Sequence, residues 1–178
     1  MPKTTAAITA IGKYLPEKVL DNATLEKMVE TNDKWITTRT GIKERRILDI
    51  PGKATAFMAT EAVKDLMKKS GLDPLEIDLL LVATVTPDMP VVATAAQVAT
   101  NLGAKNAFAF DLQAACSGFL YGMSVASAYI ESGRYKKVVL VGADMMSSIV
   151  DYTDRTTCVL FGDGAGAAVL SKEGDGPA

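Results

Sequence analysis

Hydrophobic and polar positions alternate along the chain with two periods, one typical of strands and one of helices. Residues 77–84, IDLLLVAT, are almost entirely apolar, which predicts a strand buried on both faces within a parallel sheet. Residues 54–70 instead carry apolar side chains at i, i+3, i+4 and i+7 from Ala59 onward. That spacing predicts an amphipathic helix, which Gly71 would end.

Shorter runs between these two segments follow the same alternation. Further strands are predicted at residues 6–11, 43–48, 107–112, 137–141, 158–161 and 165–170, and further helices at residues 22–29, 34–40, 94–102 and 116–132. We expect an Asn or Thr to cap the helix at 22–29, and Asp33 to cap the one at 34–40. The order of elements predicts an α/β fold, with a mainly parallel sheet and helices on both faces.

Composition and charge narrow the classes of function. Hydrophobic residues make up 48% and charged residues 22% of the 178 residues, the usual balance of a globular protein with a core. A net charge of −2 gives no electrostatic reason to expect nucleic acid. No apolar run approaches the roughly 20 residues that span a bilayer, and the N-terminus lacks a signal-type apolar core. We therefore expect a cytoplasmic protein that binds neither nucleic acid nor membrane, with its two cysteines reduced.

The chain contains no histidine. A mechanism that needs an imidazole base cannot be completed by these residues, which excludes a self-contained Cys–His or Ser–His hydrolase. The commonest metal ligand is missing as well, and no spaced cluster of Cys, Asp and Glu suggests a metal site. We expect no metal.

Cys116 is the strongest candidate for a nucleophile. It follows an apolar strand, begins a predicted helix, and has the small residues Ala114 and Gly118 two positions to either side. Small side chains allow a sharp strand-to-helix turn, as in a nucleophile elbow, and a helix N-terminus favours the thiolate. The alternative is a small cysteine buried in the core, and spacing alone does not decide between the two. Cys158 lies within an apolar run and is interpreted as a core residue.

Two other segments carry candidate binding chemistry. Trp35, the only tryptophan, lies among the basic residues Lys34, Arg39, Lys43, Arg45 and Arg46. An aromatic ring beside a basic face suits an adenine nucleotide or a phosphorylated carrier. The local sequence by itself favours a solvated segment with Trp35 in the core. FGDGAGA lacks the Gly-Lys-Ser/Thr ending of a phosphate-binding loop, and we predict a tight turn at residues 162–164 between two strands.

Four stretches occur together and in a characteristic order: DKWITTRTGIKERR at 33–46, FAFDLQAACSGFLYG at 108–122, DYTDR at 151–155 and FGDGAGAAVL at 161–170. With them the chain resembles the β-ketoacyl-acyl carrier protein synthase III family, which has the thiolase fold. The resemblance implies a protein of two similar halves with layered αβαβα architecture. Residues 1–178 resemble the first half, which carries the nucleophile.

The resemblance also implies an activity and its site residues. Cys116 would accept an acyl group from acyl-coenzyme A, a substrate rather than a cofactor, and no cofactor is expected. Malonyl-acyl carrier protein would then be decarboxylated and condensed with the acyl group to give 3-oxoacyl-acyl carrier protein. Trp35 and Arg155 would sandwich the adenine of coenzyme A. Thr31 and Arg39 would contact its nucleotide portion, and Phe161 would line the acyl pocket.

The chain departs from the family pattern at two points. The family's His and Asn, which support decarboxylation and hold the oxyanion, belong to the second half, so a second half is expected as a continuation or as a separate chain. Val91 stands where many members have a phenylalanine that reaches the partner subunit. The resemblance further implies a homodimer in which residues 107–112 lie near the two-fold axis. Two alternatives stay open: another thiolase-fold condensing enzyme, and a non-catalytic coenzyme A-binding or assembly subunit.

Overall fold

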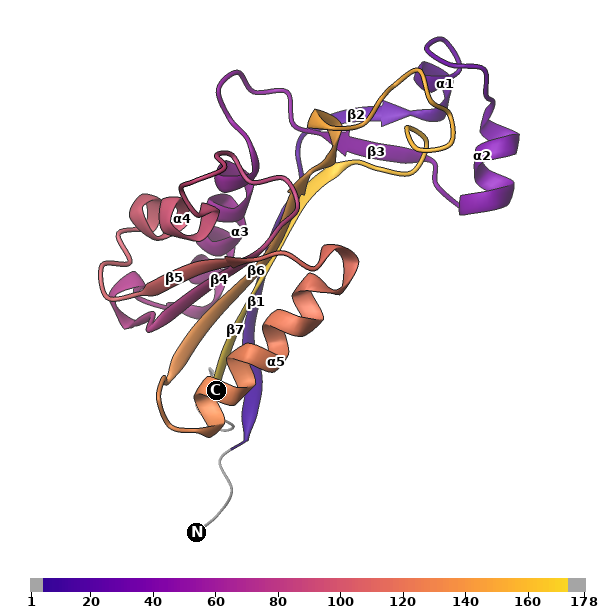
Figure 1. Cartoon of the computed structure of the whole chain (residues 1–178). Helices are drawn as coiled ribbons and strands as arrows, with labels where there is room; N and C mark the ends of the chain where they lie inside the picture. The colour runs from indigo at the N-terminus through magenta and orange to yellow at the C-terminus, as the bar shows by residue number, and fades with distance from the viewer. Residues whose placement is uncertain (1–4, 173–178) are drawn as a thin grey trace.

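A five-stranded sheet organises the computed structural model, which describes residues 5–172 (Figure 1). The strand order is β1-β7-β6-β4-β5. The strands are β1 (Ala6–Tyr14), β4 (Leu79–Ala83), β5 (Phe108–Leu112), β6 (Lys137–Met145) and β7 (Asp163–Lys172). All five residues of β4 are buried, which confirms the strand predicted from the apolar run at 77–84.

The sheet is mixed. β4 pairs in parallel with β5 and β6, whereas β7 pairs antiparallel with β6 and β1. The α/β fold is confirmed, but parallel pairing is limited to β6, β4 and β5. β7 returns from β6 through the short turn η3 (Met146–Ser148) and a loop, without the helical crossover that a parallel pairing needs.

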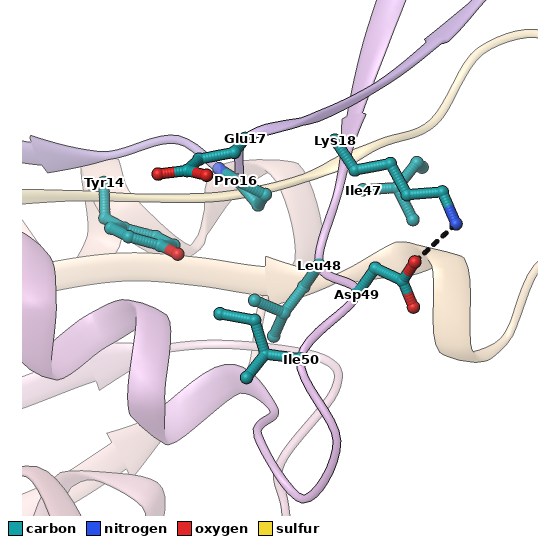
Figure 2. A pocket seen from close by; sticks show the side chains of 8 residues that line it. All are labelled: Tyr14, Pro16, Glu17, Lys18, Ile47, Leu48, Asp49 and Ile50. Carbon is teal, nitrogen blue, oxygen red and sulfur yellow. Dashed lines mark hydrogen bonds and ion pairs between the residues drawn. The ribbon is translucent and has the colours of Figure 1, made fainter.

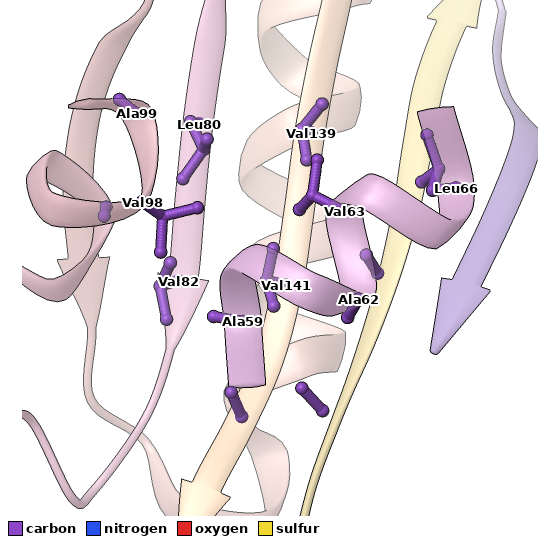
Figure 3. Packing of buried hydrophobic residues seen from close by; sticks show 14 of the residues in the cluster. Ala59, Ala62, Val63, Leu66, Leu80, Val82, Val98, Ala99, Val139 and Val141 are labelled. Carbon is purple, nitrogen blue, oxygen red and sulfur yellow. The ribbon is translucent and has the colours of Figure 1, made fainter. Parts of the chain in front are cut away.

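Helices cover both faces of this sheet. α3 (Thr55–Ser70) and α4 (Thr94–Leu102) pack on one face, and α5 (Gly118–Glu131) packs on the other. Figure 3 shows Val63 of α3 and Val98 of α4 among Leu80, Val139 and Val141 of the sheet. Alternate residues of β4 and β6 face α5 instead. No helix in the described part of the chain is long and apolar enough to cross a membrane.

A small lobe stands at one end of the sheet (Figure 1). It contains β2 (Lys18–Asp21), α1 (Asn22–Leu25), α2 (Asp33–Thr40), β3 (Glu44–Ile47) and the segment 150–161. β2 and β3 form an antiparallel ribbon. Leu25, Ile36 and Cys158 are fully buried in the core of this lobe, so segments from the two ends of the described chain share one cluster.

Two sequence predictions in the last third of the chain are wrong. Residues 158–161 form no strand, and 162–164 form no turn, because the chain passes from a looped segment directly into β7 at Asp163. Neither Gly162 nor Gly164 has a positive φ. Gly162 serves close packing instead: a Cβ there would lie 3.0 Å from Cβ of Arg45 and 3.0 Å from the carbonyl oxygen of Arg46.

Element boundaries differ from prediction at three helices. The helix predicted at 22–29 ends at Leu25, and its cap is Asp21, whose side chain accepts from the backbone N–H of Thr24. α2 begins at Asp33 and is capped by Asn32, whose side chain accepts from the N–H of Trp35. α5 begins at Gly118, after a 3₁₀ turn. The elements that complete the chain are η1 (Pro74–Glu76) and η2 (Ala115–Ser117).

Candidate active site

Cys116 lies in a sharp connection between β5 and α5. The strand ends at Leu112, Ala115 to Ser117 form η2, and α5 starts at Gly118. Ala115 is the only non-glycine residue in the described chain with a positive φ, at 44°. An L-residue in this region is strained, and such strain clusters at functional sites. The strained turn holds Cys116 out of the core, with its side chain exposed.

The start of α5 lies directly after this cysteine and has no side-chain cap. Ser117 occupies the N-cap position but makes no side-chain hydrogen bond to the helix. The first N–H groups of a helix have no partner within the helix, and its dipole is positive there. Gly118 is buried, and a Cβ on it would lie 3.1 Å from Cβ of Ala83, so a small residue lets the turn approach the end of β4.

The two cysteines differ in environment. Burial in the core is the wrong interpretation for Cys116 but is confirmed for Cys158, which is fully buried in the small lobe. Burial raises the pKa of the Cys158 thiol above its ordinary value, and the nearby Asp154 adds to this. A neutral, enclosed thiol is a poor nucleophile.

The guanidinium groups of two arginines lie over the ring of Trp35 in the small lobe. The guanidinium carbon of Arg39, one turn further along α2, is 4.5 Å from the centroid of the indole ring. The guanidinium carbon of Arg155 is 5.3 Å from the same centroid and comes from the segment before β7. Trp35 is partly buried and packs on the lobe's core, while both arginines are exposed. An aromatic ring beside two exposed cations suits a planar anionic ligand.

Thr31 and Phe161 flank this group of side chains along the chain. Thr31 precedes the cap of α2, and its buried Oγ1 makes no hydrogen bond within the described structure. Phe161 lies just before β7 with 37% of its surface exposed. The structure brings Trp35, Arg39 and Arg155 together, whereas Phe161 and Cys116 lie on separate segments.

The segments that carry Cys116 and Arg155 nevertheless leave the sheet on the same side, at the carboxyl ends of its parallel strands. Cys116 follows the end of β5, and the segment with Arg155 follows the end of β6. Both strands run parallel to β4, so their carboxyl ends lie together. In open α/β sheets this edge is where ligands bind.

Comparison with known proteins gives a consistent result. The family of 3-oxoacyl-[acyl-carrier-protein] synthase III matches residues 110–178. A β-ketoacyl-[acyl-carrier-protein] synthase III of Chlorobaculum tepidum is 57% identical over 174 residues, which are 96% of this chain and 53% of that protein. The crystal structure of 3-oxoacyl-[acyl-carrier-protein] synthase III from Aquifex aeolicus superposes with a TM-score of 0.91 at 49% identity, and covers 97% of this chain and 55% of that one.

This chain belongs to the β-ketoacyl-[acyl-carrier-protein] synthase III family. The fold and family predicted from the sequence motifs are confirmed. The chain spans about half the length of the synthase III relatives that it matches. A priming β-ketosynthase of the R1128 polyketide pathway has the same fold at lower identity, with a TM-score of 0.91 and 36% identity.

One pocket in this synthase III chain lies apart from the predicted site residues. It has a volume of about 520 Å³ and lies between the β1–β2 connection and the segment after β3 (Figure 2). Tyr14, Glu17 and Ile50 line it, together with the exposed ion pair of Lys18 and Asp49 at 2.7 Å. None of the predicted site residues lines this pocket.

The buried polar contacts of Arg45 were not predicted from the sequence. Arg45 was grouped with a basic surface, but only 4% of it is exposed. Its guanidinium donates to the carbonyl oxygen of Val159 and to Oδ1 of Asn22. The alternation of E-R-R-I in a strand was the one available signal, because it places Arg45 and Arg46 on opposite faces. Within residues 5–172, no group of three or more His, Cys, Asp or Glu residues is placed to hold a metal ion.

Proposed function

We propose that this chain is the nucleophile-bearing part of an acyl-transferring condensing enzyme that initiates fatty acid synthesis. The observation that carries the proposal is the exposed Cys116 in a strained turn, beside the uncapped start of α5. The other cysteine is enclosed, so a covalent acyl intermediate has one suitable thiol in the chain.

The first step is acyl transfer. The thiolate of Cys116 attacks the thioester carbonyl of acyl-coenzyme A, and the carbonyl oxygen becomes negatively charged. We propose that backbone N–H groups near Cys116 donate to that oxygen, a role that preorganised backbone donors fill in other acyl transferases. When the carbonyl re-forms, coenzyme A leaves as a thiolate and the acyl group remains on Cys116. The step consumes no cofactor.

The second step needs groups that this chain lacks. Malonyl-acyl carrier protein loses carbon dioxide, and the resulting carbanion attacks the acyl group on Cys116, which releases the thiolate and 3-oxoacyl-acyl carrier protein. Decarboxylation requires donors that stabilise the developing enolate. No histidine is present here to serve as one. We infer that residues 1–178 form one thiolase-like half, and that a second half, continuous or separate, supplies the histidine and asparagine.

Trp35 and Arg155 are proposed to hold the adenine of acyl-coenzyme A between them, with Arg39 and Thr31 on the nucleotide portion and Phe161 on the acyl chain. Stacked planar groups lie about 3.5–4.0 Å apart, so a sandwiched base separates its neighbours by roughly 7–8 Å. Arg155 lies 5.3 Å from the indole centroid. Binding therefore requires Arg155 to swing outward, which is easy because it is exposed and has one hydrogen bond, to the carbonyl of Glu30 at 3.1 Å.

Two surfaces support the proposed assembly. β5 is an end strand of the sheet that pairs only with β4 among the described residues, and 57% of Phe108 on it is exposed. Pairing of this edge with its symmetry copy would give the expected homodimer. Leu120 and Tyr121 of α5 are 64% and 58% exposed, an apolar surface suited to packing on the second half. We place the enzyme in the cytoplasm, where its carrier-protein substrate would be found.

Two rival functions make different predictions. A condensing enzyme of another pathway would use the same cysteine on other acyl donors. Among the solved structures, the synthase III of Aquifex aeolicus is 49% identical to this chain and the polyketide priming enzyme 36%, which supports fatty acid synthesis. A non-catalytic subunit would bind coenzyme A without taking the acyl group, and the exposed Cys116 favours catalysis over it.

The test is a condensation assay with acetyl-coenzyme A and malonyl-acyl carrier protein. The complete enzyme should form acetoacetyl-acyl carrier protein, and Cys116→Ala should abolish it, whereas Cys158→Ala should retain it. The 178-residue chain alone should be inactive, because it has no histidine. Turnover by the chain alone, or by the Cys116→Ala enzyme, would overturn the proposed mechanism.

A further inference from the structure

A buried polar network lies beneath the side chains that flank Trp35. Its centre is Asn22, the first residue of α1, which is 3% exposed. Oδ1 of Asn22 accepts a hydrogen bond from Arg45 at 2.6 Å. Nδ2 of Asn22 donates to Oδ1 of Asp33 at 2.7 Å and to the carbonyl oxygen of Ile42 at 3.0 Å. Both ends of the amide are therefore used, which fixes its orientation.

The same network reaches the segment that carries Arg155. Nε of Arg45 donates to the carbonyl oxygen of Val159 at 3.0 Å, and a second guanidinium nitrogen of Arg45 donates to the same oxygen. Val159 is four residues beyond Arg155 and two before Phe161. At the other end, Asp33 is the first residue of α2, two before Trp35. One path, Val159–Arg45–Asn22–Asp33, thus connects both sides of the indole–guanidinium pair.

The buried cation of this network lowers the stability of the small lobe, so stability alone does not explain why the network is present. Arg45 is buried, and the acceptors of its guanidinium are an amide oxygen and a backbone carbonyl, without a carboxylate among them. Burial lowers the pKa of Arg45, which reflects the penalty for enclosing a cation without an anionic partner. An apolar residue at the centre of this lobe would avoid that penalty. What an apolar residue would not supply is a rigid, directional link between two segments.

We propose that Asn22 and Arg45 are positioning residues that set the distance between Trp35 and Arg155 and so determine recognition of the nucleotide of the acyl donor. The inference rests on the proposed binding of coenzyme A by these two side chains. The hydrogen bond from Asn22 contributes most to lowering the pKa of Asp33, followed by that from Lys43, which keeps Asp33 an anionic acceptor for the amide. Neither Asn22 nor Arg45 touches the substrate.

Two variants cut the path at different points. Asn22→Asp keeps the shape and the acceptor for Arg45, but replaces the donor to Asp33 by an oxygen. Arg45→Lys keeps the charge, but a single ammonium group cannot reproduce the planar fork that reaches both Asn22 and Val159. Ile36→Val is the matched control, because it removes a methylene from the buried core of the same lobe and leaves the network intact.

The measurement is kcat/KM of the complete enzyme with two acyl donors. One is acetyl-coenzyme A, and the other is S-acetyl pantetheine, which has the same thioester and arm but no nucleotide. The ratio of interest is kcat/KM for acetyl-coenzyme A divided by kcat/KM for S-acetyl pantetheine. Asn22→Asp and Arg45→Lys should each lower this ratio at least about fivefold, since small misplacements of binding groups are costly. Trp35→Ala should lower the same ratio, and Ile36→Val should leave it unchanged.

The outcomes separate this inference from the proposed function. If Trp35→Ala lowers the ratio but Asn22→Asp and Arg45→Lys affect both donors equally, the network only stabilises the fold and the inference is overturned. If Trp35→Ala itself leaves the ratio unchanged, nucleotide binding at Trp35 is wrong, and the inference falls with it. If no variant is active with either donor while the unmodified enzyme is inactive too, the proposed function fails instead.

Discussion

The guanidinium carbon of Arg155 lies 5.3 Å from the centroid of the Trp35 indole ring, although the two residues come from α2 and from the segment before β7. The contact joins two segments of the small lobe that are far apart in the sequence. We expect this contact to matter for binding of the acyl donor, because a nucleotide base would stack on the indole of Trp35.

Replacement of Trp35 by Ala in the complete enzyme should raise KM for acetyl-coenzyme A roughly tenfold or more, because loss of a ring–base stack costs about 1–3 kcal/mol. Steady-state kinetics measure this directly. Lys34→Ala is a suitable control, since Lys34 is an exposed neighbour on α2, whereas the cations over the ring are Arg39 and Arg155. An unchanged KM with a lower melting temperature would mean that Trp35 serves only the core.

The thiols should differ in reactivity. Because Cys116 is exposed and Cys158 is buried with a raised pKa, iodoacetamide at neutral pH should alkylate Cys116 at least about tenfold faster in the folded protein. Peptide mass spectrometry distinguishes the two sites. In urea both should react alike, which controls for intrinsic differences. Equal rates in the folded state would contradict the described environments.

The strained turn should respond to glycine. Ala115 has φ at 44°, a region in which glycine is unstrained. Ala115→Gly should therefore raise the free energy of unfolding by about 0.5–1 kcal/mol, despite the added freedom of glycine in the unfolded chain. Ala115→Val should lower it, because a β-branched residue fits that conformation worst. Urea denaturation of both variants tests this, and destabilisation by Ala115→Gly would contradict the observed turn.

Association should depend on the exposed faces of β5 and α5. The isolated 178-residue chain should sediment as a dimer or larger species, because Phe108 and the apolar surface of α5 are exposed on it. In the complete enzyme, Phe108→Glu should weaken the dimer by placing a charge on the edge strand. Sedimentation at several concentrations measures both. A well-behaved 18.8 kDa monomer would contradict the proposed assembly.

Several elements of the fold could be predicted from the sequence, because their buried residues recur with the period of a strand or a helix. The strand β4 and the helix α3 are visible because their apolar residues follow the period of the element. In β5 the alternation of Phe108 and Phe110 with other residues is enough to place both rings on one side of the strand, where their centroids lie 5.8 Å apart. Local periodicity was sufficient in each case.

Other features depend on contacts that periodicity does not encode. The glycines at 162–164 resembled a turn, yet Gly162 is required by its packing against β3. The burial of Arg45 depends on Asn22 and Val159, which come from two other segments. The exposure of Cys116 and the burial of Cys158 likewise depend on tertiary structure. For Cys116 and Trp35, the order of the four motifs was more informative than any single spacing.

The central claim is that Cys116 accepts the acyl group. The most direct test is to incubate the complete enzyme with acetyl-coenzyme A alone and to locate the acetyl group by peptide mass spectrometry. One acetyl group should be found on the peptide containing Cys116 and none on the peptide containing Cys158, and malonyl-acyl carrier protein should remove it as acetoacetyl-acyl carrier protein forms. Product formation without any acetylation of Cys116, or with acetylation of another residue, would contradict the account.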